Sequence, residues 1–146
     1  MANVVFETLT DAQAANFNGP IDTLVFTSPT ASGKLITVTY VAAVVTPSTN
    51  TPASITIASP GARTVTFPAV TSPALGGIAG DLGTFFSFDG STLYVGSDTA
   101  NDVASGTAFD DGLYGGGGDD NLSGLAGNDL LQGNSGNDTQ IGRAHV

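Results

Sequence analysis

The hydrophobic residues in the first part of the chain alternate with polar residues, which are mostly threonine and serine. This period of two is typical of strands that bury one face, because successive side chains of a strand point to opposite sides. We interpret the segments as half-buried antiparallel strands. They lie at Leu24 and Phe26; Ile36, Val38 and Tyr40; Ile55 and Ile57; Val65 and Phe67; Phe86 and Phe88; and Leu93 and Val95.

Turn-forming residues separate these segments, since glycine tolerates positive φ and proline, asparagine and aspartate favour turns. One short helix is expected over residues 11–17, with Thr10 or Asp11 as its cap and Gly19 beyond its end. Residues 1–96 are therefore predicted to form a small antiparallel β-sandwich-like domain of unknown role. The predicted turns are Asn18-Gly19-Pro20, Ser32-Gly33, residues 46–52, Ser59-Pro60-Gly61 and Asp89-Gly90.

From residue 97 to residue 141 the pattern changes to a repeat of nine residues. The units share glycine at positions one and four, aspartate at position six and an aliphatic residue at position eight. The glycine-rich part suits a tight turn and the last three residues suit a very short strand, so stacked units bury a column of leucines. Two units form one coil, which places turns eighteen residues apart above one another. The units read SDTANDVAS, GTAFDDGLY, GGGGDDNLS, GLAGNDLLQ and GNSGNDTQI.

The repeat brings like charges together, because eight aspartates and no lysine or arginine lie between Asp98 and Asp138. A cation is needed between the stacked turns. Carboxylate and carbonyl oxygens, without cysteine or a nearby histidine, favour calcium over zinc or copper. Magnesium requires a smaller and stricter octahedron. The predicted ion is Ca²⁺, and the position-six residues are Asp102, Asp111, Asp120, Asp129 and Asp138.

The stretch GGGGDDNLSGLAGNDLLQG resembles the RTX, or haemolysin-type, repeats of secreted bacterial proteins, and the resemblance covers about forty-five of the 146 residues. It implies an all-β chain that ends in a parallel β-roll. It also implies that one ion bridges turns two units apart, through carbonyl oxygens and position-six aspartates. The implied first site joins Gly116, Gly118 and Asp120 to Gly133, Ser135 and Asp138. The implied second site joins Thr107, Phe109 and Asp111 to Gly124, Ala126 and Asp129. A weaker third site joins Asp98, Ala100 and Asp102 to Gly115, Gly117 and Asp120.

The array departs from the family pattern at both ends. Ala100 and Phe109 replace the position-four glycine, so the first two turns are expected to miss the positive-φ conformation. Gln140 stands where an aliphatic side chain should enter the core. Residues 142–146 are expected to be an irregular or truncated tail.

Other interpretations of the acidic tract fit less well. A flexible acidic linker would lack phased leucines. The glycines from Gly115 to Gly118 lead into two aspartates rather than a lysine, and these would repel a phosphate. The only glutamate is Glu7, so no EF-hand loop has its closing ligand. Tyr114, at an outward position of the roll, is expected on the surface.

The chain is predicted not to be an enzyme. It has no HExxH or GxSxG motif and no cysteine, and its one histidine is His145. Asp81 and Asp89 could form a carboxylate pair for sugar chemistry, but Asp89-Gly90 is more simply a hairpin turn. The alternative is that the chain is a fragment of a secreted RTX hydrolase or toxin whose catalytic domain lies elsewhere.

Charge and hydropathy limit the partners and the location. The net charge of −10 argues against nucleic acid and anionic membranes as direct partners. No apolar run is long enough for a membrane span, and the N-terminus does not read as a cleaved signal peptide. The lack of that signal resembles the type I secretion of RTX proteins. We therefore expect a secreted, extracellular or cell-surface protein, with calcium, a second copy or a cell-surface or matrix component as its partners.

The expected function is calcium binding by a β-roll that folds on calcium outside the cell, in a structural, adhesive or matrix protein. Calcium is scarce inside a bacterium and abundant outside, so the tract would stay unfolded until export. Chelation is then expected to unfold residues 97–141 and to leave most of the N-terminal strands. Exposed strand edges of the roll could also allow end-to-end self-assembly.

Overall fold

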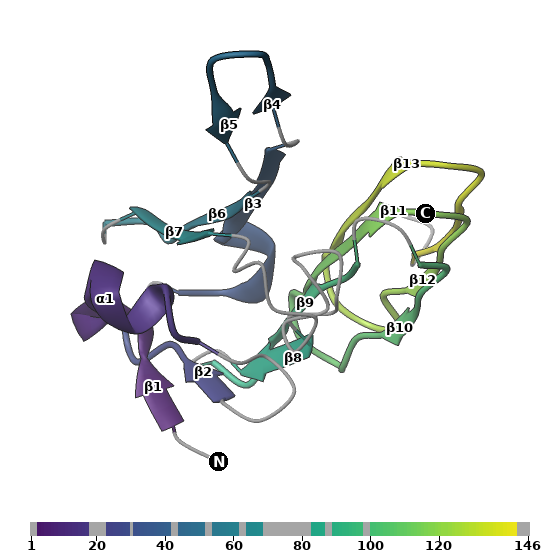
Figure 1. Cartoon of the computed structure of the whole chain (residues 1–146). Coiled ribbons are helices and arrows are strands. Elements are labelled where there is room, and N and C mark those ends of the chain that lie inside the picture. The colour runs from purple at the N-terminus through teal and green to yellow at the C-terminus, as the bar shows by residue number, and fades with distance from the viewer. Residues whose placement is uncertain are drawn as a thin grey trace.

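The computed structural model describes residues 3–17, 23–29, 31–41, 44–51, 54–61, 64–68, 83–86, 89–97 and 100–142. Figure 1 shows the N-terminal elements on one side and the coiled repeats on the other. Several of the positions considered above lie outside the described residues, and they are the turn Asn18-Gly19-Pro20, Pro52, Asp81, Phe88, Asp98 and residues 143–146.

Three antiparallel strands form a small sheet in the N-terminal part, in the order β3 (Thr37–Val41), β6 (Ser54–Ala58) and β7 (Thr64–Pro68). The alternation identifies its buried face, because Val38, Ile55, Ile57, Val65 and Phe67 are all buried. Gly61 has a φ of 69° in the predicted turn between β6 and β7. The hairpin of β4 (Val44–Val45) and β5 (Asn50–Thr51) projects from this sheet (Figure 1). The antiparallel arrangement expected here is confirmed.

A six-stranded sheet connects the start of the chain to the repeats. Its only antiparallel pair is β8 with β9, and the other neighbours are parallel. The expectation of antiparallel strands is therefore wrong for β2, which holds Leu24. Alternation reports which face is buried but not the direction of the neighbouring strand. In order, the strands are β1 (Asn3–Val5), β2 (Thr23–Val25), β8 (Gly83–Phe86), β9 (Thr92–Val95), β11 (Gly112–Gly117) and β13 (Leu130–Ser135).

The helical segments carry the chain across the core. A 3₁₀ helix (Phe6–Thr8) and the helix α1 (Asp11–Ala14) lie between the parallel strands β1 and β2, which need such a crossover. Thr10 caps α1 through a capping box with Gln13, as expected, but α1 ends before Phe17. The Phe17 ring packs edge-on against Phe67, with ring centroids 5.5 Å apart. The described residues contain no helix long and apolar enough to cross a membrane.

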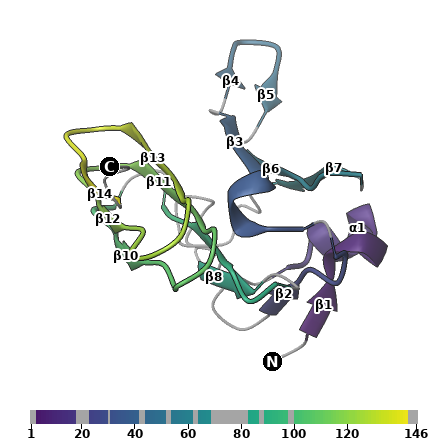
Figure 2. The same ribbon diagram turned by 180° about the vertical axis from the view of Figure 1, so that it is seen from behind.

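The repeats form a parallel β-roll, as predicted. A second parallel sheet contains β10 (Val103–Ser105), β12 (Asn121–Ser123) and β14 (Thr139–Ile141), and it faces β9, β11 and β13 (Figure 2). Successive strands are shifted by eighteen residues, as in the pair of Leu122 with Gln140. The side chains that pack between the two sheets are Tyr94 from β9 and the position-eight residues Ala104, Leu113, Leu122 and Leu131. The leucine column and the coil of two units are confirmed.

The first coil is in register from Gly96 rather than from Ser97. Strand β9 pairs with β11 at an offset of nineteen residues, with Leu93 opposite Gly112. Further along, the offset is eighteen again, as the hydrogen bond from the Asp102 N–H to the Asp120 carboxylate shows. The first unit therefore has ten residues, from Gly96 to Ser105, instead of nine.

Tyr114 is buried, with only 1% of its surface exposed, so the prediction of a surface tyrosine is wrong. Its side chain does point away from the interior of the roll, but N-terminal elements cover that face. The Tyr114 hydroxyl donates to the Ile36 carbonyl at 2.7 Å. The Tyr40 hydroxyl donates to the Gly96 carbonyl at 3.0 Å from the same side. The pattern of a single repeat cannot show that another part of the chain covers its outer face.

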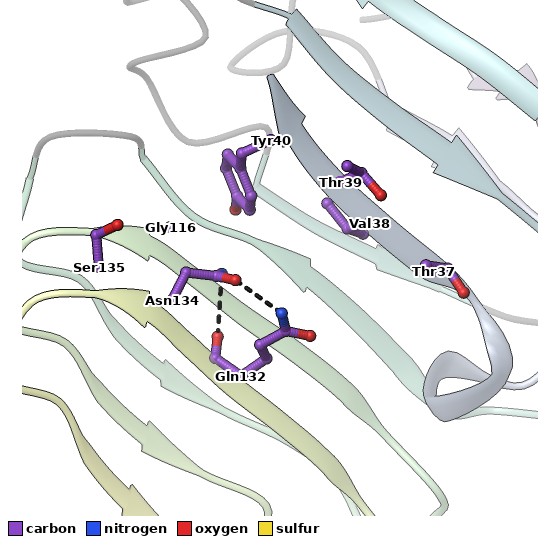
Figure 3. A pocket seen from close by; sticks show the side chains of 8 residues that line it. All are labelled: Thr37, Val38, Thr39, Tyr40, Gly116, Gln132, Asn134 and Ser135. Atoms are coloured by element: carbon purple, nitrogen blue, oxygen red, sulfur yellow. Dashed lines mark hydrogen bonds between the residues drawn. The ribbon is translucent and has the colours of Figure 1, made fainter. Parts of the chain in front are cut away.

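Beyond the contacts of Tyr114 and Tyr40, the N-terminal part and the roll separate. A polar cleft of about 400 Å³ lies between β3 and the outer face of β11 and β13 (Figure 3). Thr37 and Thr39 line one side, and Gln132 and Asn134 line the other, where the Gln132 amide donates to Asn134 Oδ1 at 2.8 Å. The N-terminal part therefore supports the first coil of the roll more closely than the later ones.

Candidate metal centre

The turns of the roll stack on two flanks, because each turn crosses between the two sheets. The turns at residues 106–111 and 124–129 lie on one flank, where the chain passes from β10 to β11 and from β12 to β13. The turns at residues 96–102, 115–120 and 133–138 lie on the other flank. Turns on one flank are two units apart, which is the arrangement that the RTX resemblance implies.

The position-six carboxylates form a ladder along each flank. In every rung the Oδ1 atom accepts a backbone N–H from the corresponding residue one coil earlier. This contact fixes the aspartates in the predicted vertical register. The rungs run from Thr92 to Asp111 at 2.6 Å, Asp102 to Asp120 at 2.9 Å, Asp111 to Asp129 at 3.1 Å, and Asp120 to Asp138 at 3.0 Å.

A second ladder uses position five and runs in the opposite direction. Here the side-chain oxygen of one coil accepts the N–H of the following coil. These residues were not predicted from the sequence. A signal was present, since position five is asparagine or aspartate in all five units. The rungs run from Asp119 to Asn101 at 3.0 Å, Asn137 to Asp119 at 2.9 Å, and Asn128 to Asp110 at 2.9 Å.

The glycine at position one makes room for the carboxylate of its own unit. A Cβ added at Gly115, Gly124 or Gly133 would overlap with the Oδ2 atom of Asp120, Asp129 or Asp138, respectively. At Gly96 it would lie 2.6 Å from Asp102 Oδ2. Position one is therefore glycine for steric reasons, with its Cα packed directly against the acidic group.

The last three turns share a backbone conformation that the second turn lacks. Position four has positive φ at Gly118, Gly127 and Gly136, and position two has it at Gly116 (101°), Leu125 (68°) and Asn134 (73°). Thr107 and Phe109 in the second turn do not have it. The expected departure from the family geometry at position four is confirmed for Phe109.

A carboxylate oxygen of the fourth turn has no hydrogen-bond donor. Asp129 Oδ2 is buried and accepts no hydrogen bond. Burial raises the pKa of Asp129, and the charges of Asp111 and Asp110 raise it further. Such an oxygen needs a proton or a cation nearby. A hard oxygen donor of this kind suits calcium.

Backbone oxygens would have to complete any metal site in this region. No group of three or more histidine, cysteine, aspartate or glutamate side chains that could hold a metal occurs among the described residues. The sets implied by the RTX resemblance fit this limit, since each has two position-six aspartates and takes its remaining ligands from carbonyl groups. Calcium accepts such mixed oxygen sets with flexible geometry.

The residues of the implied first site lie in neighbouring turns. Gly116 is opposite Asn134 and Gly117 is opposite Ser135 in the β11–β13 pair. The Gly118 N–H donates to the Ser135 carbonyl at 2.9 Å, and the Asp120 N–H donates to Asp138 Oδ1 at 3.0 Å. The structure therefore brings Gly116, Gly118 and Asp120 close to Ser135 and Asp138, with Gly133 packed against Asp138.

The second and third implied sites are less regular. Asp111 and Asp129 are in register, and the Ala126 N–H lies 3.4 Å from the Thr107 carbonyl oxygen. The third site includes Asp98, which lies outside the described residues. Its register also differs, because Gly96 rather than Ser97 packs against Gly115. Which atoms bind an ion stays a prediction for all three sites.

The comparison with protein families agrees with this geometry. The family model described as RTX calcium-binding nonapeptide repeat, four copies in length, matches residues 96–131 and again residues 114–142. No curated protein and no solved structure matches the chain. The match begins at Gly96, where the register of the roll also begins. Residues 96–142 are therefore RTX calcium-binding nonapeptide repeats of the haemolysin type.

Proposed function

We propose that this chain is a non-catalytic extracellular protein, structural, adhesive or matrix-forming, whose β-roll folds when it binds calcium outside the cell. RTX repeats bind Ca²⁺ as a structural ion and typify secreted bacterial proteins. The observation that carries the proposal is the stacking of acidic turns on both flanks, with the buried Asp129 Oδ2 atom lacking a donor.

The residues that would hold the ion most completely are those of the first implied site. Asp120 and Asp138 supply carboxylate oxygens, and Gly116, Gly118, Gly133 and Ser135 supply carbonyl oxygens. The ion supplies positive charge between two turns that would otherwise repel each other. The positive φ of Gly116 and Gly118 sets the direction of the carbonyl groups in this turn.

Calcium can determine whether the roll is folded. A site with a dissociation constant of about 10⁻⁴ M, usual for extracellular modules, stabilises the fold by roughly 1.4 kcal/mol at millimolar calcium. Each occupied site adds a similar amount, and small domains are stable by about 5–15 kcal/mol in total. Removal of calcium is therefore expected to unfold the turns that depend on it.

The described carboxylates support a structural role over a catalytic one. Asp89 Oδ1 accepts the Ser91 N–H at 3.0 Å and the Ser91 hydroxyl at 2.6 Å, which is the bonding of a turn aspartate. Gly90 next to it has a φ of 86°. The alternative, a fragment of a secreted RTX hydrolase or toxin, is distinguished by the intact mass of the native gene product.

The test compares the full chain in calcium and in chelator, with magnesium as the control ion. We expect calcium, and not magnesium, to increase the strand signal in far-UV circular dichroism and to protect the repeats from proteolysis. Metal analysis of the calcium-loaded chain gives the number of bound ions. Equal order of the repeats in chelator and in calcium would contradict folding on calcium.

A further inference from the structure

The position-six carboxylates are satisfied in two different ways. In the first two turns the Oδ2 atom accepts a backbone N–H from position two of the same unit. Ser97 donates to Asp102 Oδ2 at 2.6 Å, and Thr107 donates to Asp111 Oδ2 at 2.6 Å. In the fourth turn Asp129 Oδ2 has no donor. The first two turns therefore supply a backbone donor to Oδ2 of their own aspartate, and the fourth turn does not.

Asp111 and Asp129 form a matched pair, because they lie eighteen residues apart on one flank. Asp111 is fully buried and accepts the Thr92 N–H, the Thr107 N–H and the Thr107 hydroxyl. Two or three such donors keep a buried carboxylate ionised without a metal. Asp129 has only the Asp111 N–H.

The backbone conformation at position two accompanies this difference. Leu125, which corresponds to Thr107 one coil later, has a φ of 68°. Thr107 does not have positive φ, and its N–H points at its own aspartate. Gly116 and Asn134 share the conformation of Leu125. The last three turns therefore form one class and the first two form another.

N-terminal residues hold the first coil from outside. The Asp110 carboxylate forms an ion pair with Lys34 at 2.6 Å, and the Lys34 side chain holds the pKa of Asp110 below its usual value. The Asp110 carbonyl accepts the Ser32 hydroxyl at 3.0 Å and the Lys34 N–H at 3.1 Å. Tyr114 is anchored to Ile36 on the sheet side. None of these contacts needs an ion.

We infer that the first coil of the roll, residues 96–114, keeps its structure without calcium and is the template on which calcium assembles residues 115–142. Asp102 and Asp111 are then acceptors for backbone N–H groups rather than calcium ligands, unlike the position-six residues of the later turns. The inference rests on the proposed function for the later turns. Beyond that function, it identifies the first coil as the part of the array that does not depend on the ion.

The experiment is hydrogen exchange of the full chain, read by mass spectrometry in chelator and across a calcium titration. In chelator we expect β9, Thr107 and residues 112–114 to stay protected, because their hydrogen-bond partners lie in the first coil or the N-terminal part, while β12, β13 and β14 exchange rapidly. Calcium should protect the later strands and β10, whose strand partner is β12. The number of ions bound, measured by native mass spectrometry, should be the same for the parent chain and for Asp111→Asn.

Three variants separate the roles of the carboxylates. Asp129→Asn should raise the calcium midpoint for protection of residues 121–142 by about tenfold, because one charged ligand is lost, and should leave exchange at Thr107 unchanged in chelator. Asp111→Asn should increase exchange at Thr107 in chelator by about tenfold or more, because it removes the acceptor of the Thr107 N–H, and should keep the calcium midpoint of the later strands within about twofold. Asp119→Asn is the control, because asparagine occupies position five in three other units.

The outcomes distinguish the inference from the proposed function. If the first coil exchanges in chelator together with the rest, the template idea is wrong and folding on calcium stands. If no strand responds to calcium, the proposed function itself fails. An equal shift of the calcium midpoint by Asp111→Asn and Asp129→Asn would make Asp111 a ligand and overturn the inference. If Asp111→Asn does not fold, Lys34→Met provides the second test, since it should weaken protection of residues 112–114 in chelator only.

Discussion

A methyl group added at Gly115 should disrupt the regular part of the roll. The new Cβ of Gly115→Ala would overlap with Asp120 Oδ2 and would lie 2.7 Å from its Cγ atom and 3.0 Å from its Cβ atom. Asp120 is only 2% exposed, and its Oδ1 is fixed by the Asp102 N–H at 2.9 Å. The carboxylate cannot move aside without breaking that bond, so the substitution displaces an implied calcium ligand.

The loss of folding stability in Gly115→Ala has three parts. Loss of a hydrogen bond to a charged group costs about 2 kcal/mol, and overpacking of a buried site costs about 1 kcal/mol or more. Loss of one ion removes roughly 1.4 kcal/mol at ten times the dissociation constant. We expect Gly115→Ala to lower the free energy of unfolding by about 4 kcal/mol in saturating calcium.

The assay is urea unfolding followed by circular dichroism, together with calorimetric calcium titration. Gly142→Ala is the matched control, because an added Cβ there meets no atom within 4 Å. It should change the stability by less than about 0.5 kcal/mol. A Gly115→Ala variant with the calcium affinity and stability of the parent chain would refute the steric account of position one.

Three further predictions follow from single contacts. Tyr114→Phe removes the hydrogen bond to Ile36 and should lower the free energy of unfolding in urea by about 1 to 2 kcal/mol. Burial raises the pKa of Tyr114, so the stability that the tyrosine contributes is present below its unfolded pKa of about 10 and is lost as the pH rises above that value. The variant should not show this loss. Burial opposes the shift at Glu7, but hydrogen bonds from Ser28 and Thr27 outweigh it and lower the pKa of Glu7. Glu7 therefore stabilises the fold above its unfolded pKa and less as the pH falls through the folded pKa, and Glu7→Gln should cost about 1 kcal/mol at neutral pH and reduce the acid sensitivity of unfolding. Leu122→Ala removes a fully buried side chain from the leucine column and should cost about 3 kcal/mol, measured by calcium-saturated thermal unfolding; a cost below about 1 kcal/mol would contradict the packing of position eight.

The repeat made the roll predictable because its information is local and periodic. The spacing of Asp102, Asp111 and Asp120 indicated turns in vertical register, and the ladder of N–H bonds to position six has that register. The position-eight leucines indicated the interior. The same periodicity contained the position-five ladder, but an exposed asparagine or aspartate also fits an ordinary turn, so its role was visible only in the structure.

The remaining features depend on contacts between distant segments. Alternation around Leu24 gave a strand but not its parallel neighbours, which follow from the crossover through α1. The burial of Tyr114 depends on residues 33–38, which are far away in sequence. The extra residue in the first unit was hidden because Ser97 can be read as position one, and only the pairing of β9 with β11 places Gly96 there.

The residue types at positions five and six separate a hydrogen-bond ladder from an ion site. Position five needs only one acceptor oxygen, which Asn101 supplies to the Asp119 N–H, and asparagine occupies this position in three of the five units. Position six is aspartate in all five units, although a single rung of its ladder also needs only one oxygen. An asparagine at position six would place an NH₂ group where the aspartates have Oδ2, next to the position-one glycine. At that place Asp111 Oδ2 accepts the Thr107 N–H, and Asp129 Oδ2 has no donor. The second oxygen must therefore be an acceptor in every turn. Backbone N–H groups satisfy it in the first coil, and in the fourth turn Asp129 Oδ2 remains available for a cation.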